Sequence, residues 1–115
     1  MQRGRALKAV ALLLFLIVSS SDVLAQKQIR FQRGKSSATV RGPIAADGYL
    51  EYVVNGRAGQ VMTIEITSGN GAVVVNAGTA TGKSFTIEMS GGDHLLSVVN
   101  TGRRATNYTL TVSIR

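Results

Sequence analysis

The sequence predicts an all-β domain, an antiparallel two-sheet β-sandwich of about eight short strands. Apolar and polar residues alternate through several runs, and a period of two places successive side chains on opposite faces of a strand. Turn-forming residues separate these runs at intervals of about 8–12 residues, which is typical of sandwiches. Beyond residue 25 no stretch has the periodicity of an amphipathic helix. A partly closed barrel is the alternative.

The first 25 residues are predicted to be a secretory signal peptide that is cleaved after Ala25. A basic start precedes an unbroken apolar run of ten residues, Ala9–Val18. A membrane anchor is the competing interpretation, but a helix of this length spans only about half of the ~30 Å hydrocarbon layer. We therefore expect a periplasmic or secreted protein, with one domain over residues 26–115 and no transmembrane segment after removal of the signal.

Export would leave a basic chain without cysteine. Residues 26–115 contain ten basic and five acidic side chains, a net charge of +5. Disulfides are excluded, and 90 residues are enough for one hydrophobic core with little room for a second domain. The low aromatic content argues against a nucleic-acid partner, because bases need aromatic side chains on which to stack.

The stretch LEYVVNGRAGQVMTIEI, Leu50–Ile66, is the one on which we expect the other strands to pack. Each half alternates and so has one apolar face, and the central Asn55–Gln60 holds two glycines that suit a reversal. We predict a long antiparallel hairpin here. Other strands must cover it, because an isolated hairpin is marginally stable in water.

Two further strands are expected before this hairpin. The run Ile29–Gln32 alternates and indicates a first strand, and Arg33–Ser37 reads as a polar turn. Ala38–Arg41 is a second extended run, which we expect Gly42-Pro43 to end.

The remaining strands follow the hairpin. Ala72–Val75 is a short apolar run, and Asn76–Lys83 is expected to be a flexible loop. Ser84–Met89 alternates again, His94–Val99 is the next strand, and Asn107–Ile114 closes the fold with the most regular alternation in the chain.

No set of residues points to catalysis, a metal or a cofactor. His94 is the only histidine, so a site rich in His or Cys cannot be built, and we interpret it as a structural residue in an aromatic slot. A retaining pair of carboxylates among Glu51, Glu65 and Glu88 is conceivable. We favour solubilising charges on a polar sheet face instead. The sequence therefore predicts a protein that is not an enzyme.

The basic residues are more informative. One group lies near the mature start, and a pair stands in the loop NTGRRAT: Arg30, Arg33, Lys35 and Arg41, then Arg103 and Arg104. Ordinary solvated charge is one interpretation. The other is a protruding loop that enters an acidic cleft of a partner, because a guanidinium binds a carboxylate through two parallel hydrogen bonds.

Several motifs resemble known families. AGQVMTIEI, GGDHLLSVVNTG and NYTLTVSI resemble the pattern of bacterial pre-peptidase C-terminal domains, which are secreted β-sandwiches. RFQRGKSSATVRGPI, followed by a Tyr-containing strand and AGQ, is similar to the periplasmic inhibitors of g-type lysozyme. The likeness covers most of Gln28–Ile114, and His94 stands where these families usually carry Tyr.

The resemblance implies a proteinaceous inhibitor of g-type lysozyme, which blocks the acidic cleft of the enzyme with a basic loop. Tyr49 and Tyr52, or the GKSSA turn, would form a second contact, with Tyr49 expected to be the more exposed of the two tyrosines. The expected contact residues are Arg103, Arg104, Tyr49, Lys35, Ser36 and Ser37. The alternative is a stand-alone module, like a pre-peptidase C-terminal domain, with an adhesive or structural role at the cell envelope and an envelope polysaccharide or a secreted protein as partner.

Overall fold

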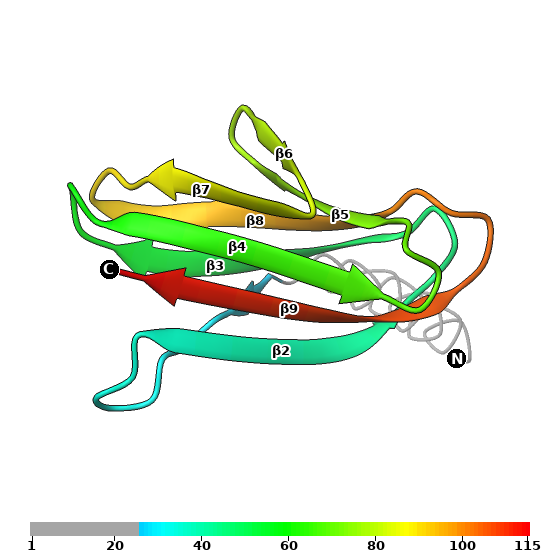
Figure 1. Cartoon of the computed structure of the whole chain (residues 1–115), viewed down its shortest axis with the longest axis horizontal. Coiled ribbons are helices and arrows are strands. Elements are labelled where there is room, and N and C mark those ends of the chain that lie inside the picture. Colours follow the sequence, from blue (N-terminus) through cyan, green and yellow to red (C-terminus); the bar gives the residue numbers. More distant parts are fainter. Residues whose placement is uncertain (1–25) are drawn as a thin grey trace, which may run out of the picture.

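The computed structural model describes residues 26–115, and the predicted signal peptide lies outside the described residues. The described part is all-β, with nine strands (Figure 1). In chain order they are β1 (Lys27–Gln28), β2 (Ser37–Ile44), β3 (Tyr49–Gly56), β4 (Val61–Ser68), β5 (Val73–Ala77), β6 (Ala80–Gly82), β7 (Ser84–Glu88), β8 (Gly92–Asn100) and β9 (Thr106–Ile114).

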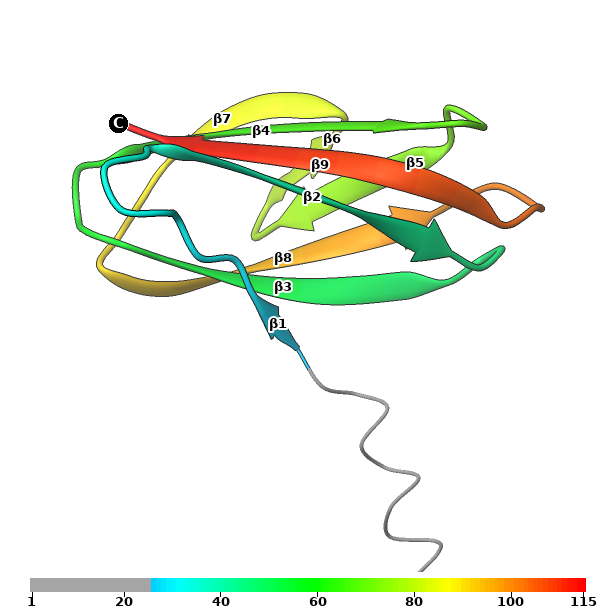
Figure 2. The same ribbon diagram turned by 90° about the horizontal axis from the view of Figure 1, so that it is seen from below.

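The strands form two sheets that lie one above the other (Figure 2). One sheet has five strands in the order β1-β3-β8-β5-β6, and the other has four in the order β2-β9-β4-β7. Neighbouring strands are antiparallel except for the short pair β1–β3. The predicted antiparallel sandwich is thus confirmed, with nine strands in place of about eight.

The core lies between the two sheets and is made by the alternate residues that face inward. Met62, Ile64 and Ile66 of β4 are buried in the same core cluster as Leu96 and Val98 of the other sheet. Each such side chain contributes about 1.5–3 kcal/mol when it leaves water. The alternation that the sequence shows in β3, β4, β8 and β9 is therefore the pattern of this core.

One buried polar pair joins the sheets. The hydroxyls of Tyr52 in β3 and Tyr108 in β9 share a hydrogen bond within the core. Burial, and then the hydrogen bond with Tyr52, raise the pKa of the Tyr108 hydroxyl well above its usual value. The Tyr108 hydroxyl thus stays protonated at any physiological pH.

The hairpin predicted over Leu50–Ile66 is wrong, because its two strands belong to different sheets. β3 pairs with β1 and β8, whereas β4 pairs with β7 and β9. The turn Arg57–Gln60 is an arch between the sheets, in which the Gln60 N–H donates to the Arg57 carbonyl at 3.1 Å. A hairpin and an arch give the same alternation, since each strand has one apolar face in both. In the arch the two apolar faces meet across the core.

Three shorter predictions also differ from the structure. The first strand is Lys27–Gln28 and not Ile29–Gln32. β2 continues through Gly42-Pro43, because it is an edge strand, where a proline without an N–H is tolerated. The loop expected at Asn76–Lys83 contains β6, which forms a hairpin with β5.

Among the described residues no helix is long and apolar enough to cross a membrane.

Candidate partner-binding surface

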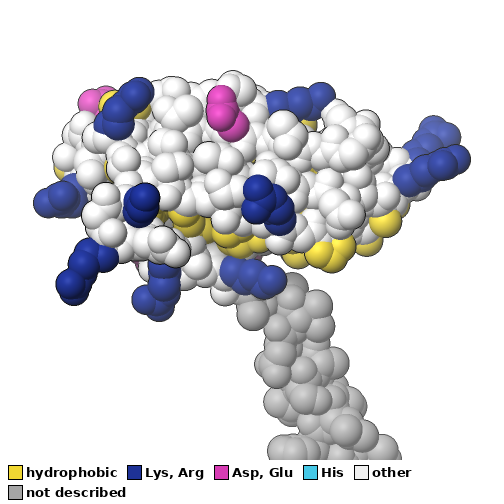
Figure 3. All heavy atoms as spheres, turned by 60° about the horizontal axis from the view of Figure 1, so that its bottom comes forward, with side chains coloured by type: hydrophobic (Ala, Val, Ile, Leu, Met, Phe, Trp, Pro, Cys, Tyr) yellow, Lys and Arg dark blue, Asp and Glu magenta, His cyan; other side chains and the backbone are white. Residues whose placement is uncertain are grey.

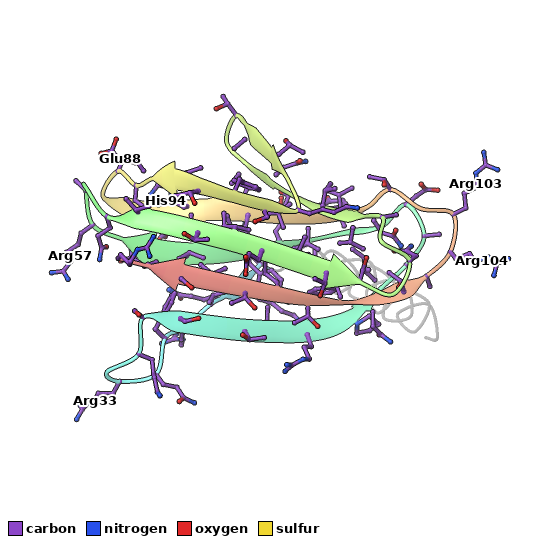
Figure 4. The ribbon with its side chains drawn as sticks, in the orientation of Figure 1. Arg33, Arg57, Glu88, His94, Arg103 and Arg104 are labelled. Atoms are coloured by element: carbon purple, nitrogen blue, oxygen red, sulfur yellow. The ribbon has the colours of Figure 1, made fainter. Side chains whose placement is uncertain are left out.

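The segment Thr101–Ala105 joins β8 to β9 at one end of the sandwich, and we call it the arginine loop. Its Arg103 and Arg104 are exposed, and both point away from the body (Figure 4). The space-filling view shows basic side chains projecting beyond the body at this end (Figure 3). Their guanidinium groups can therefore reach a partner before the sheets do.

Asn100, the last residue of β8, fixes the arginine loop to the body of the protein by hydrogen bonds. This side chain is fully buried, with 0% of its surface exposed. Its amide nitrogen donates to the carbonyl oxygens of Ala45 at 3.0 Å and of Arg104 at 2.9 Å. Its amide oxygen accepts from the Gly102 N–H at 2.9 Å and from the side-chain amide of Asn70 at 3.2 Å. Asn100 thus ties three loops together at this end.

The neighbouring loop Gly69–Ala72 supports the arginine loop from the side. Thr101 donates to the Ala72 carbonyl from its N–H at 2.9 Å and from its hydroxyl at 2.8 Å. Gly102 packs so tightly that a Cβ atom there would lie 2.7 Å from the Asn70 amide nitrogen. The backbone on both sides of the arginines is therefore fixed by hydrogen bonds and close packing.

Tyr49 lies at the same end as the arginine loop. It opens β3 opposite Val99, and the carbonyl of Gly48 before it accepts from the Asn100 N–H at 3.0 Å. With 58% of its surface exposed, it is one of two large exposed hydrophobic residues in the described chain. Tyr49 and the two arginines thus form one candidate surface.

Lys35, Ser36 and Ser37 lie at the opposite end of the sandwich. The Ser36 carbonyl accepts from the N–H of Ile114 at the end of β9, whereas the arginine loop precedes the start of that strand. The nine residues of β9 separate the two ends by about 30 Å, at ~3.3 Å per residue. The structure therefore divides the expected contact residues into two groups.

The conceivable catalytic groups do not come together. The ring Nε2 of His94 lies 2.8 Å from the Ser90 carbonyl oxygen and donates to it. Glu65 lies opposite Ser84 and Glu88 opposite Val61, about 13 Å apart along the strands, while Glu51 belongs to the other sheet. A retaining pair would need a separation of about 5 Å. Within residues 26–115 no group of three or more His, Cys, Asp or Glu could hold a metal ion.

Asn100 and Asn70 are the residues of this surface that the sequence analysis missed. A signal for Asn100 exists, because it follows Leu96 and Val98 at a spacing of two and so faces the interior. A buried amide needs hydrogen-bond partners, and an amide at a strand end can find them in the adjoining loops. Nothing in the sequence indicates that Asn70 would be its partner.

Comparison with known proteins supports the fold. No protein-family model matches the chain, and no curated protein matches it in sequence. The solved structure of Aeromonas hydrophila PliG, described as a periplasmic lysozyme inhibitor of g-type lysozyme, is similar with a TM-score of 0.71 and 20% identity over 79% of this chain and 96% of that one.

Two further solved structures share the fold. Salmonella Typhimurium PliG, with the same description, has a TM-score of 0.63 and 20% identity over 78% of this chain and 97% of that chain. The pre-peptidase C-terminal domain of collagenase from Bacillus anthracis has a TM-score of 0.58 and 17% identity over 79% of this chain and 95% of its own length. The chain therefore has the fold of both families that its motifs resemble.

Proposed function

We propose that residues 26–115, exported after cleavage behind Ala25, form a periplasmic or secreted inhibitor of g-type lysozyme. The arginine loop enters the acidic cleft of the enzyme, and Tyr49 makes a second contact beside it. The observation that carries this proposal is the exposed pair Arg103 and Arg104 on a loop that the buried Asn100 holds in place. The fold shared with periplasmic lysozyme inhibitors supports it.

The chemistry of the loop suits a glycosidase cleft. Such clefts contain carboxylates that act as acid, base or nucleophile. A guanidinium pairs with a carboxylate in a planar, bidentate geometry and occupies the place of the sugar. Two adjacent arginines on a loop of five residues can address both carboxylates of the cleft.

The rigidity of the arginine loop favours tight binding. Ordering a flexible loop at an interface reduces affinity, because conformational freedom is lost on association. Here the hydrogen bonds of Asn100 and Thr101 order the backbone before any partner arrives. Only the two arginine side chains and Tyr49 lose freedom when they bind.

Inhibition of peptidoglycan lysis tests the proposal. The mature protein is added in increasing amounts to a g-type and to a c-type lysozyme, and the loss of turbidity is followed. We expect inhibition of the g-type enzyme, and a variant with Arg103→Ala and Arg104→Ala should inhibit about 30-fold less well or worse.

A matched variant with Arg41→Ala and Lys83→Ala controls for net charge, because both residues are exposed and lie outside the arginine loop. It should inhibit like the unmodified protein. Unchanged lysis over a wide molar excess of inhibitor would exclude the function. Full inhibition by the Arg103/Arg104 variant would exclude the arginine loop as the inhibitory element.

The alternative is a stand-alone adhesive module without a lysozyme partner. The fold similarity to the pre-peptidase C-terminal domain of collagenase favours it, although the TM-score is lower than for the lysozyme inhibitors. Failure of the mature protein to bind any lysozyme, together with binding to a component of the cell envelope, would favour this alternative.

A further inference from the structure

The end of the sandwich away from the arginine loop carries a second concentration of positive charge. Arg33 and Lys35 stand in the β1–β2 connection, Arg57 in the arch between β3 and β4, and Arg115 after β9. All four side chains are exposed, and Arg33 and Arg57 are seen at this end in Figure 4. We call these four residues the basic end.

Two open hollows meet at Lys35 within the basic end. One is lined by Arg30, Gln32, Lys35 and Thr39. The other is lined by Lys35, Arg57, Asn55 and Gln60 together with Phe31 and Ile114, and the Asn55 amide donates to the Asp93 carboxylate at 2.9 Å. Each hollow thus combines cationic groups with side-chain amides or hydroxyls, and Lys35 belongs to both.

The backbone that carries these side chains is held in place. The Lys35 N–H donates to the Gln32 carbonyl at 2.8 Å across a turn in which Gly34 has a φ of 79°, a value that suits glycine. The Gln60 side chain accepts from the Arg57 N–H at 2.7 Å. Arg115 exchanges two backbone hydrogen bonds with Val61, at 2.8 and 2.9 Å. The cations therefore stand on ordered backbone.

The residues that line the two hollows favour some classes of anionic ligand over others. Lysine and arginine bind carboxylates and phosphates, while amides and hydroxyls bind the hydroxyl groups of sugars. Single-stranded nucleic acid is held by stacking on exposed aromatic rings, and binding to a lipid surface is strengthened by exposed apolar side chains in addition to charge. In the described chain the large exposed hydrophobic residues are Tyr49 and Leu95, and neither lines these hollows. Phe31 and Ile114 line the second hollow but are partly buried and packed against the core.

We propose that the basic end is a binding site for an anionic glycan, a sugar chain that carries carboxylates or phosphates. Lys35 lies at its centre, with Arg57 on one side and Arg30 on the other. The site is about 30 Å from the arginine loop, so both can be occupied at once. It is independent of the proposed inhibition and would anchor the protein to an anionic polymer while the arginine loop stays free.

Titration of the ¹⁵N-labelled mature protein with a carboxylated oligosaccharide, hexameric oligogalacturonate, tests this site. We expect shifts of the backbone amide signals of Lys35, Ser36 and Arg57, and none in Thr101–Ala105. Neutral maltohexaose should shift no signals, and added salt should weaken the binding of the acidic probe, because screening weakens exposed charge pairs.

Two charge-reversed variants provide the matched comparison. Arg30→Glu with Arg57→Glu, which removes one cation from each hollow, should weaken binding of oligogalacturonate about tenfold or more, whereas Arg103→Glu with Arg104→Glu, an equal change in net charge, should leave it within about twofold. All four residues are exposed, and thermal melts verify that both variants fold. The first variant should keep its inhibition of lysozyme, so failure of one proposal is distinguishable from failure of the other.

Three results would overturn the proposal. One is equal weakening by the two variants, which would mean attraction by net charge alone. Another is absence of amide shifts at the basic end with millimolar oligogalacturonate. The third is binding to vesicles of phosphatidylglycerol with no binding to the oligosaccharide, which would assign the basic end to a lipid surface.

Discussion

Replacing Asn100 with alanine should destabilise the protein far more than any other change of a polar side chain at its loop end. The substitution removes four hydrogen bonds, to Ala45, Arg104, Gly102 and Asn70. Each hydrogen bond contributes about 0.5–1.5 kcal/mol net, and buried groups left without a partner cost more. Some of these groups can regain water, because Ala45 and Arg104 are exposed. We therefore expect the free energy of unfolding to fall by about 2–4 kcal/mol.

Urea unfolding measures this loss, and thermal melts should show a midpoint lower by roughly 10–25 °C. Asn76→Ala is the matched control, since this asparagine is exposed on β5, and it should change the stability by less than about 0.5 kcal/mol. Asn100→Asp keeps the shape but turns a carboxylate toward two carbonyl oxygens, so it should destabilise more than alanine at neutral pH. A loss of less than about 0.5 kcal/mol for Asn100→Ala would refute the reasoning, because the arginine loop would then not depend on this amide.

Three further outcomes follow from the packing. Tyr108→Phe should lower the free energy of unfolding by about 1–3 kcal/mol, because it leaves the Tyr52 hydroxyl unpaired. Changing both Tyr52 and Tyr108 to Phe should lower it by less than the sum of the two single changes. A double-mutant cycle measured by urea unfolding checks this. Because the pKa of Tyr108 is raised on folding, the folded protein keeps a proton that the unfolded chain loses, so stability should be unaffected up to about pH 10 and fall above it. Urea midpoints from pH 8 to 11 check this, and the fall should be smaller in Tyr108→Phe. Gly102→Ala should cost about 1–3 kcal/mol, because its methyl group would displace the Asn70 amide that binds Asn100, and a wild-type melting temperature would contradict it.

The faces of the strands could be predicted from the sequence, whereas their partners could not. Met62, Ile64 and Ile66 alternate with polar residues and all three are buried, because a half-buried strand requires this period. The same alternation is compatible with a hairpin or an arch at Arg57–Gln60. Which of the two forms depends on contacts such as that of the Gly59 N–H with the Met89 carbonyl at 3.0 Å, which are distant in sequence.

The candidate surface likewise has features that the sequence predicts and features that it does not. The exposure of Arg103 and Arg104 could be predicted, because two basic residues stand in a short polar loop between strands. The sequence pattern could not show whether Lys35 lies near these arginines. The end of the sandwich at which a loop lies depends on the direction of every strand. Asn100 was missed because its role consists of contacts to three loops that only the folded chain brings together.

Hydrogen–deuterium exchange of the mature protein, alone and mixed with a g-type lysozyme, tests the central claim most directly. The account predicts that the enzyme slows exchange in the arginine loop and at the start of β3 around Tyr49, and leaves the Lys35 turn unchanged. Protection confined to the Lys35 turn, or no change at any amide at saturating enzyme, would contradict it.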